Sequence, residues 1–423
     1  MFQPPESTQP ATFPLSKADR CVKCGLCLPH CPTYTLTQDE AQSPRGRIAL
    51  MQGLATGQLD ASDKLQAHLD GCLSCRACES VCPAQVPYGE LIDAVRGDLQ
   101  QTNPNRNRSL RWLAFWLTQA RPRTLLARLL LLLQVSGLLR LAKRLSKGIK
   151  PLERRLQFIP AMQNTPARRR YAVPDGVQKR GTVQLFTGCV SELFDARSLH
   201  DAITCLQYCG FEVDVPVQQG CCGALHQHNG MHSQAQSLFA NNIKAFGAHE
   251  QPVLGTASGC TAMLAEYEIY QDSQHAKDFS ARIQDISAFI FEHWSADTAV
   301  AAFKGRALVQ DACTLRNVLG SSQAVYRLLD KIPGLDIVPL PDNNQCCGAA
   351  GSMMFSHPDQ ADALVNKKIQ AIEALGGKPP EYLLSSNIGC ALHLQAALKR
   401  AGIELEVLHP VSLLARQLKQ AEN

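Results

Sequence analysis

The feature of this 423-residue sequence that most constrains its fold is a run of four cysteines that occurs twice. In each run, two residues separate the first three cysteines, three residues precede the fourth, and a proline follows it. The runs consist of Cys21, Cys24, Cys27 and Cys31, and of Cys72, Cys75, Cys78 and Cys82. Two-residue gaps let the backbone curl around one side of an iron–sulfur cube, and in two-cluster proteins the cysteine before proline ligates the other cube. The spacing therefore predicts two [4Fe–4S] clusters that exchange one ligand.

Each predicted cluster thus takes its fourth ligand from the other run. We expect cluster 1 to be held by Cys21, Cys24, Cys27 and Cys82, and cluster 2 by Cys72, Cys75, Cys78 and Cys31. Zinc is the alternative, because closely spaced cysteine pairs also form four-cysteine zinc sites. A zinc site requires four ligands but neither a repeated spacing nor a proline after the fourth cysteine. The two identical runs that end in Cys-Pro therefore favour clusters. Reduced thiols at this density are typical of a chain that stays in the cytosol, where disulfides are rare.

The residues around the two runs have the periodicity of short helices. Ser43 and Pro44 resemble an N-cap followed by proline at the first helical position, and apolar residues recur at helical spacing over 47–54 and 61–69. We expect an α-helical, ferredoxin-like domain over residues 18–102, after a flexible tail over residues 1–17. Arg45 and Arg47 could place positive charge near a cluster, or they could belong to a solvated helix start.

The segment over residues 103–180 is basic and rich in leucine. From residue 101 to residue 180 there are 18 Lys and Arg against two acids, a net charge of +16; the whole chain carries +5, so the remainder carries −11. Its uncharged, mostly apolar run, Leu129–Leu139, is short of the roughly 20 residues that a spanning helix needs. We expect a basic amphipathic linker with Trp112, Trp116 and the leucines on its apolar face. Such a face fits a membrane surface, a partner subunit or the rest of the chain, and no nucleic-acid motif accompanies the basic residues.

From residue 181 onward, the sequence repeats one pattern of strands and helices. Strand-like runs occur at three corresponding places in each half, namely 182–186, 211–217 and 252–256, then 307–310, 335–340 and 381–384. Strands that alternate with helices predict α/β units built on a parallel sheet. We therefore expect an α+β multidomain protein, in which two duplicated α/β lobes over residues 181–300 and 301–423 follow the helical domain.

Each lobe contains four cysteines in corresponding places, two of them adjacent and followed by glycine. The sets are Cys189, Cys221, Cys222 and Cys260, and Cys313, Cys346, Cys347 and Cys390. Adjacent cysteines cannot both point inward from a regular strand, so each pair must lie on a turn in which the glycine supplies backbone freedom. Because α/β folds build their sites where strands end, one or both lobes are candidates for a further iron–sulfur cluster. Zinc binding and thiol chemistry are the alternatives.

The lobes resemble the Cys-Cys-Gly domains of heterodisulfide reductase subunits and of several quinone-linked dehydrogenase subunits. In that family the motif ends in Cys-x-x-Cys, and five cysteines hold a non-cubane [4Fe–4S] cluster. Here Met263 and His393 stand where the fifth cysteine would follow Cys260 and Cys390. This departure argues against disulfide-reducing chemistry and leaves a four-cysteine cluster, or one completed by His393.

Nearly the whole chain, from about Cys21 to Leu414, resembles the iron–sulfur subunit of bacterial glycolate oxidase. The matching motifs are Cys-x-x-Cys-Gly-x-Cys, Ser-Pro-Arg-Gly-Arg-Ile from Ser43, the second cysteine run, Asn387–Cys390 and His409-Pro410-Val411. The resemblance implies a subunit that takes electrons from FAD-containing subunits oxidising a 2-hydroxy acid and passes them towards membrane quinone. We accordingly expect a cytoplasmic protein bound peripherally to the inner membrane. Subunits of lactate and glycerol-3-phosphate dehydrogenases, a heterodisulfide-type reductase and a metal-stabilised scaffold are the alternatives.

Other cysteines and histidines have plainer interpretations. Cys205 and Cys209 are four residues apart in a helical stretch, which predicts buried structural thiols. His226, His228 and His232 lack a carboxylate or cysteine at metal spacing, so we expect polar surface histidines or satisfied loop histidines. We find no FAD or NAD fingerprint in the sequence, which fits a flavin bound by partner subunits.

Overall fold

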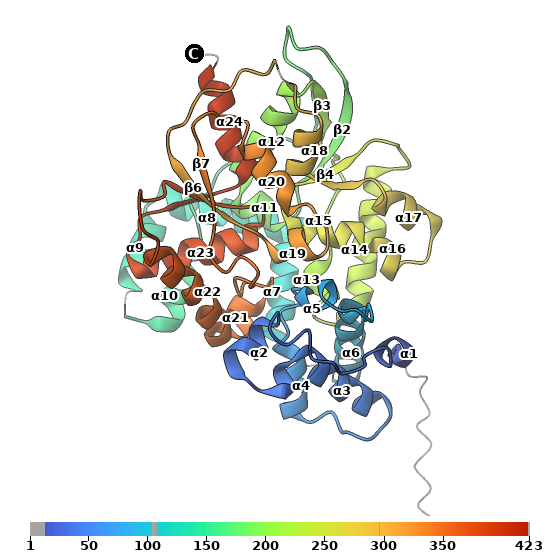
Figure 1. Ribbon diagram of the computed structural model, residues 1–423. Helices are drawn as coiled ribbons and strands as arrows, with labels where there is room; N and C mark the ends of the chain where they lie inside the picture. The colour runs from blue at the N-terminus through green and yellow to red at the C-terminus, as the bar shows by residue number, and fades with distance from the viewer. Residues whose placement is uncertain (1–12, 104–105, 107, 147, 296, 422–423) are drawn as a thin grey trace, which may run out of the picture. The chain divides into compact units, whose positions relative to one another are not determined.

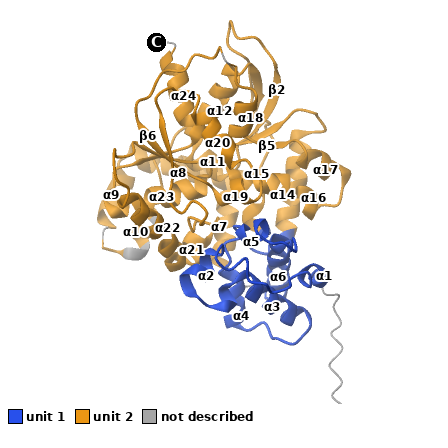
Figure 2. Cartoon of the chain, in the orientation of Figure 1, with its two compact units in different colours: residues 1–106, 227–232 blue, residues 107–226, 233–423 orange. Residues whose placement is uncertain are grey.

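The computed structural model describes residues 13–103, 106, 108–146, 148–295 and 297–421. Contacts divide the chain into two compact units (Figure 2), with residues 1–106 and 227–232 in unit 1 and residues 107–226 and 233–423 in unit 2. Each unit has a hydrophobic core of its own.

The described part of unit 1 is helical, as the sequence predicts. Its elements are α1 (Leu15–Ala18), α2 (Pro32–Thr37), the 3-10 turn η1 (Glu40–Gln42), α3 (Pro44–Ala55), α4 (Asp63–Asp70), α5 (Ala77–Ser80) and α6 (Tyr88–Thr102). The predicted start of α3 is confirmed: the Ser43 hydroxyl accepts a hydrogen bond from the Gly46 amide at 2.9 Å, and Pro44 takes the first helical position. Apolar side chains of α3, α4 and α6 form the core of the unit.

The sequence predicts a flexible tail over residues 1–17, of which residues 1–12 lie outside the described residues. Phe13 is 5% exposed within the core of unit 1, and α1 begins at Leu15. The prediction of a flexible segment is therefore wrong for residues 13–17, because Phe13 and Leu15 pack on the core and Lys17 binds Glu90 at 2.5 Å.

A short segment from the middle of the chain, residues 227–232, belongs to unit 1. His228 Nδ1 lies 3.0 Å from a carboxylate oxygen of Asp93, which is 1% exposed, and Arg96 donates a hydrogen bond to the His228 carbonyl at 2.9 Å. His228 is thus a satisfied loop histidine, as expected. Its partner could not be found from the sequence, because Asp93 lies 135 positions away.

Unit 2 contains two sheets with the same strand order (Figure 1). In lobe 1 the strands β2 (Gly181–Phe186), β3 (Phe211–Asp214), β4 (Val253–Gly255) and β5 (Ile283–Asp285) are parallel in the order β3-β2-β4-β5, and β1 (Arg170–Tyr171) pairs antiparallel with β3. In lobe 2 the strands β6 (Arg306–Gln310), β7 (Asp336–Pro339), β8 (Tyr382–Ser385) and β9 (Glu406–Leu408) are parallel in the order β7-β6-β8-β9. The equal order fits the predicted repeat of one α/β unit.

Helices connect these strands in each lobe. In lobe 1 they are α11 (Val190–Phe194), α12 (Ala196–Tyr208), α13 (Ala224–Gln227), α14 (His232–Phe246), α15 (Ser258–Ala265), α16 (Tyr267–Tyr270), α17 (Gln274–Ser280) and α18 (Ile286–Glu292). In lobe 2 they are α19 (Cys313–Asn317), α20 (Ser322–Leu329), α21 (Met353–Ser356), α22 (Pro358–Glu373), α23 (Ile388–Ala401) and α24 (Pro410–Ala421).

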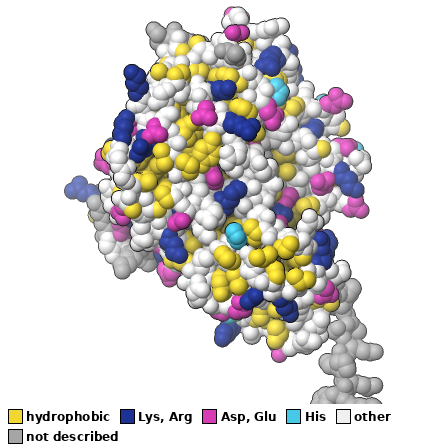
Figure 3. All heavy atoms as spheres, viewed as in Figure 1, with side chains coloured by type: hydrophobic (Ala, Val, Ile, Leu, Met, Phe, Trp, Pro, Cys, Tyr) yellow, Lys and Arg dark blue, Asp and Glu magenta, His cyan; other side chains and the backbone are white. Residues whose placement is uncertain are grey.

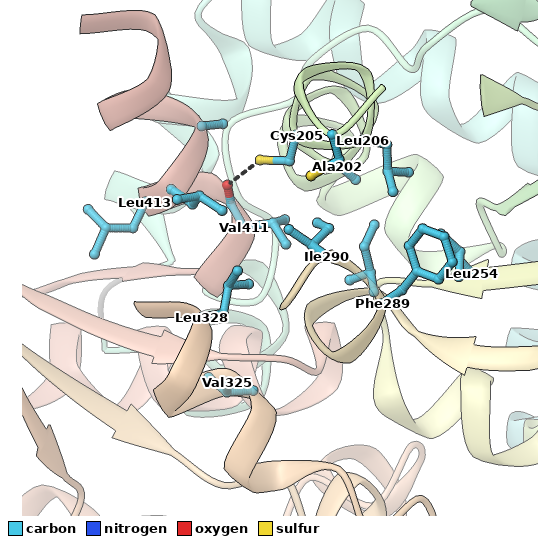
Figure 4. Close-up of a cluster of buried hydrophobic side chains, with 14 of the residues drawn as sticks. Ala202, Cys205, Leu206, Leu254, Phe289, Ile290, Val325, Leu328, Val411 and Leu413 are labelled. Atoms are coloured by element: carbon cyan, nitrogen blue, oxygen red, sulfur yellow. Dashed lines mark hydrogen bonds between the residues drawn. The ribbon is translucent and has the colours of Figure 1, made fainter. Parts of the chain in front are cut away.

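The last helix of each lobe packs on the other lobe. Helix α24 of lobe 2 packs on α12 of lobe 1, and α18 of lobe 1 packs on α20 of lobe 2. Figure 4 shows the shared core, where Leu206, Ile290 and Leu328 come from α12, α18 and α20 and the Cys205 thiol donates to a main-chain carbonyl of α24 at 3.5 Å. Cys205 and Cys209 are 0% and 2% exposed, so their prediction as buried structural thiols is confirmed.

His409 joins the two lobes at the start of α24. Its Nε2 donates to the Thr256 carbonyl at 2.8 Å, and its Nδ1 accepts from the Val411 amide at 3.1 Å. Burial lowers the pKa of His409 to about 4, whereas an unfolded histidine has a pKa of about 6.5. Between these values the unfolded chain binds a proton that the folded chain does not, so this residue's contribution to stability is lost as the pH falls.

We expect His409→Gln to remove part of the acid sensitivity of folding. From about pH 7.5 to about pH 4.5, the unmodified chain should lose about 2–3 kcal/mol more unfolding free energy than the variant, because each unit of pKa difference is worth about 1.4 kcal/mol. Urea unfolding at both pH values measures the difference. Buried Asp285, whose pKa burial raises to about 6, titrates in both proteins and cancels. Equal losses would contradict the expectation.

The basic segment predicted as a linker forms four helices. They are α7 (Arg108–Thr118), α8 (Ala120–Val135), α9 (Leu138–Leu145) and α10 (Lys150–Leu156). Arg123 and Arg168 bind Glu192 of lobe 1 at 2.9 and 2.5 Å, and Arg154 binds Asp362 of lobe 2. Within the described residues, no one helix meets the length and hydropathy of a membrane span, although α8 and α9, bent at 83°, do so as a pair. The segment is therefore attached to both lobes.

Candidate iron–sulfur sites

The two cysteine runs of unit 1 line two cavities that share part of their lining. The first cavity has about 470 Å³ of space outside protein atoms, part of it open to solvent, and the second about 310 Å³. The cysteines of the first are Cys21, Cys24, Cys27, Cys78 and Cys82, and those of the second are Cys31, Cys72, Cys75 and Cys78. Cys82 therefore lies at the cavity of the first run and Cys31 at that of the second, which is the exchange that the spacing predicts.

The separation of these cysteines suits a cluster better than an ion. A zinc ion needs four ligand atoms about 2.0–2.3 Å from one centre. Over the described ranges, no three His, Cys, Asp or Glu side chains converge in a way that could hold one ion. A [4Fe–4S] cube is larger, and its thiolates stand further apart around it. The cavities and their donors therefore fit iron–sulfur clusters.

Both runs curl around their cavities through matching left-handed residues. Lys23 and Ser74, each directly before the second cysteine of its run, have φ of 56° and 48°. Gly25 and Arg76, each directly after that cysteine, have φ of 87° and 58°. Residues other than glycine rarely adopt positive φ, and it costs energy when they do. The repetition of this strain indicates that the curl around the cavity determines the backbone conformation.

Burial favours the protonated form of two thiols at the cavities, Cys27 and Cys78. Burial raises the pKa of Cys27 to about 11 and that of Cys78 well above its ordinary value. Iron binds thiolates, so assembly of a cluster must displace these protons.

Sequence reasoning missed three side chains at the cavities or left them undecided. Tyr88 is 4% exposed and lines both cavities, with its hydroxyl 3.6 Å from Cys72 Sγ. The Thr33 hydroxyl lies 3.2 Å from Cys31 Sγ. Arg47 lines the second cavity and is 1% exposed, so it does not belong to a solvated helix start. No sequence signal marks Tyr88 or Thr33, because only the tertiary fold brings them to the cysteines.

Arg96 holds the second cysteine run in place. This buried side chain donates hydrogen bonds to the main-chain carbonyls of Leu69, Asp70 and Cys72 at 2.9, 3.0 and 2.8 Å. It also bonds the carbonyl of His228, so the guanidinium ties the run to segment 227–232. The fixed fork of five N–H donors on arginine suits this role.

In each lobe the four cysteines follow the carboxyl ends of parallel strands. In lobe 1 the Sγ atoms of Cys189 and Cys221 are 3.3 Å apart. In lobe 2 those of Cys347 and Cys390 are 3.0 Å apart, and those of Cys313 and Cys346 are 4.0 Å apart. The hydrogen bond to the neighbouring thiol, and then burial, raise the pKa values of Cys189 and Cys313 well above their ordinary value. The structure thus brings predicted lobe cysteines close together, and it favours the protonated form of Cys189 and Cys313.

The Cys-Cys-Gly turns are alike in the two lobes. Gly223 and Gly348 have φ of 85° and 86°, and each donates its amide to the first cysteine of the pair at 3.4 Å. The prediction that glycine supplies backbone freedom at these turns is confirmed.

Gly348→Ala should destabilise the chain far more than Gly351→Ala. Both residues have positive φ, which costs an alanine about 1–2 kcal/mol. An added Cβ at Gly348 would lie 2.8 Å from the Ala361 carbonyl oxygen, whereas one at Gly351 meets nothing within 4 Å. We expect losses of about 3 kcal/mol or more at Gly348 and about 1–2 kcal/mol at Gly351 in denaturant unfolding. Equal losses would show that the contact with Ala361 is unimportant.

The two lobes differ in the residues beside the cysteine pair. In lobe 2 Lys368 of α22 is 2% exposed and donates to the Asp342 carbonyl, close enough to Cys346 and Cys347 to interact with their charges. In lobe 1 the neutral Asn242 of α14 donates to the Cys221 carbonyl at 2.8 Å. Burial lowers the pKa of Lys368, and in lobe 1 Arg123 lies close enough to Cys189 to lower the pKa of that thiol. A basic side chain therefore acts on the cysteines of each lobe.

His393, the alternative ligand of lobe 2, is fully buried in α23. Its Nε2 donates to the Ala361 carbonyl at 3.1 Å, and burial lowers its pKa. Nδ1 has no hydrogen-bond partner within the described ranges. Only that nitrogen is left for a metal.

Comparison with known families agrees with these sites. Residues 17–86 match the family of 4Fe-4S dicluster domains, and residues 183–265 and 307–395 each match the family of cysteine-rich domains. The chain is thus an iron–sulfur protein with a dicluster domain and two cysteine-rich repeats.

Curated relatives extend the match to nearly the full length. The probable glycolate oxidase iron-sulfur subunit of Bacillus subtilis (strain 168) is 31% identical over 415 residues, 93% of this chain and 92% of the relative. The glycolate oxidase iron-sulfur subunit of Escherichia coli (strain K12) is 32% identical over 391 residues, 89% of each chain. Lactate utilization protein A of Geobacillus sp. (strain WCH70) is 29% identical over 237 residues, 55% of this chain and 98% of that protein. The chain belongs to the family of glycolate oxidase iron–sulfur subunits, as its motifs predict.

Proposed function

We propose that this chain relays electrons within a flavin-dependent 2-hydroxy-acid dehydrogenase, with glycolate as the substrate. The oxidation takes place on FAD-containing partner subunits, and the electrons pass through the clusters of this chain towards membrane quinone. The observation that carries the proposal is the pair of adjoining cavities lined by the two cysteine runs. The names of the two nearly full-length relatives support glycolate, and the name of the shorter relative makes lactate the second candidate.

The first cavity has the features of an electron entry site. Cys24 is exposed, and Val22 and Leu26 on the same loop are 72% and 56% exposed. Apolar side chains that project around a redox site suit contact with a protein partner. We propose that this loop is the contact site for the flavin subunit.

The function is tested by isolating the chain with its natural partners and supplying one substrate at a time. Glycolate should reduce an added dye and bleach the visible absorbance of the clusters, whereas D-lactate and glycerol-3-phosphate should do so weakly. A stronger response to D-lactate would replace glycolate by the second candidate. Reduction by none of the three, with flavin present, would contradict the proposed class of reaction.

A membrane surface is the second partner that we propose. Nine large apolar side chains of α7, α8 and α9 are each at least 50% exposed: Trp112, Phe115, Leu125, Leu129, Leu132, Val135, Leu138, Leu141 and Leu145. We call these nine residues the apolar stripe. Spacings of three and four residues place its members on one face of each helix. The stripe is exposed although the segment is bound to both lobes, so packing on this chain does not account for it.

Charge favours anionic lipid over a protein as the partner of the stripe. Exposed arginines stand on the same three helices, namely Arg108, Arg111, Arg121, Arg128, Arg140 and Arg144, and no acidic residue occurs from residue 99 to residue 152. On the face drawn in Figure 3, Lys and Arg side chains are interspersed with Asp and Glu, in contrast to the acid-free sequence of these three helices. Helices with an apolar face and flanking arginines lie in the interface of anionic bilayers. We therefore propose that the chain binds an anionic membrane surface, the cytoplasmic face of the inner membrane.

A further inference from the structure

Arg47 brings a buried positive charge to the second cavity, and none of its hydrogen-bond acceptors among the described residues is an acid. Arg47 Nε donates to the His68 carbonyl at 2.7 Å, Nη1 to the Thr33 hydroxyl at 3.0 Å, and Nη2 to the Gln42 side-chain oxygen at 2.5 Å. All three acceptors are uncharged, and an arginine side chain does not lose its proton in proteins. The charge is therefore undiminished where water is excluded and electrostatic interactions are strong.

Two hydroxyl groups connect this region to ligands of cluster 2. Thr33, which accepts a hydrogen bond from Arg47, has its hydroxyl 3.2 Å from Cys31 Sγ. The Tyr88 hydroxyl contacts a ligand of cluster 2 directly, because it lies 3.6 Å from Cys72 Sγ. Hydrogen bonds to the sulfurs and nearby positive charge both stabilise the reduced, more negative state of a cluster.

Among the described residues that line the first cavity, no charged side chain is buried as Arg47 is. Its arginine, Arg45, binds Glu40 with Nε 2.6 Å from the carboxylate and donates to the Lys23 carbonyl at 3.0 Å. The Arg45 and Glu40 side chains are 29% and 49% exposed, so the pair is neutral overall and screened by solvent. The environment of cluster 1 therefore lacks the stabilisation that Arg47 gives to cluster 2.

We infer that Arg47 and Tyr88 raise the reduction potential of cluster 2 above that of cluster 1, which makes transfer from cluster 1 to cluster 2 the downhill direction. One electron leaves cluster 1, which is oxidised, and enters cluster 2, which is reduced; no bond changes and no proton moves. The donor that reduces cluster 1 is the flavin of the partner subunit, and in this respect the inference rests on the proposed function. The exposed loop around Cys24 lies at the entry end, and the cluster beside Arg47 lies at the exit end.

The test is a redox titration of the full chain followed by electron paramagnetic resonance, with dithionite and mediators in place of the flavin subunit. The midpoint potential that disappears in Cys75→Ala identifies cluster 2. We expect this potential to be the higher of the two. Arg47→Met should lower it by at least a tenfold change in the reduction equilibrium, about 59 mV for one electron, and leave the other potential nearly unchanged.

Two further variants keep the test decisive. Tyr88→Phe removes only the hydroxyl, and should lower the same potential by a smaller amount even if Arg47→Met fails to assemble its clusters. Arg45→Gln is the matched control, and it should shift both potentials by less than Arg47→Met shifts the potential of cluster 2. If Arg47→Met does not assemble its clusters, the shift in Tyr88→Phe is the reference instead. A higher potential for cluster 1, or unchanged potentials in Tyr88→Phe with full iron content, would overturn the inference. Since no flavin partner takes part, that result would leave the proposed function untouched.

Discussion

Cys31→Ala is expected to destroy cluster 2 while leaving cluster 1 intact, although Cys31 belongs to the first run. The residue lies at the second cavity together with Cys72 and Cys75, and Cys82 lies at the first. A cube that loses one of four thiolates loses its anchorage, so iron should fall from about eight to about four atoms per N-terminal unit. Cys82→Ala should give the opposite result, with cluster 1 lost and cluster 2 retained.

The ligand sets can also be tested without measuring absolute iron content, by comparing which paramagnetic signal each cysteine variant loses. With exchanged ligands, Cys31→Ala and Cys75→Ala lose the same paramagnetic signal, and Cys82→Ala and Cys24→Ala lose the other. If each run held its own cluster, Cys31→Ala would instead behave like Cys24→Ala, and the proposed ligand sets would be wrong. Cys205→Ala is the control, because that thiol is buried in the core of the lobes and should leave both signals unchanged.

The second large effect concerns the apolar stripe. Replacing Leu125, Leu129, Leu132 and Leu141 by glutamine should weaken binding to vesicles containing phosphatidylserine by at least 100-fold. Full burial of a leucine is worth about 1.5–3 kcal/mol, so even partial insertion of four leucines accounts for the roughly 2.7 kcal/mol that a 100-fold change requires. Co-sedimentation with vesicles measures the change.

Charge and position supply the controls for this measurement. Replacing Arg121, Arg128, Arg140 and Arg144 by glutamine should abolish the preference for anionic over neutral vesicles, since each contributes about 1 kcal/mol near such a surface. Val217→Gln and Ile269→Gln remove exposed apolar side chains outside the stripe and should have no effect. If the unmodified chain ignores vesicles but loses its flavin partner when the stripe is altered, the stripe is a protein interface instead.

The parts of the structure with strong local signals were predictable. The cysteine spacing predicted that Cys82 lies with the first run and Cys31 with the second, but it did not predict that Cys78 lines both cavities. The longer strands β2 and β6 were predicted within one residue at their starts, since they are apolar and begin each repeat. The strands β5 and β9 were missed, because runs of three residues such as Ile283–Asp285 carry no periodicity.

Features that depend on distant contacts were not predictable. Nothing in the sequence around His228 indicates that its segment belongs to unit 1 or pairs with Asp93. The exchange of α18 and α24 between the lobes depends on a core shared by both repeats. Whether Arg47 was buried beside a cluster or solvated could be decided only once its exposure and its three acceptors were known.

The most direct test is the metal and sulfide content of the full chain prepared without oxygen. Two clusters in unit 1 require about eight irons and eight acid-labile sulfides per chain, with up to four more of each if lobe 2 holds a third cluster. We expect a brown protein with at least the first of these values, little zinc, and paramagnetic signals after reduction by dithionite. A colourless protein with zinc and no sulfide would mean that no path for electrons exists in this chain.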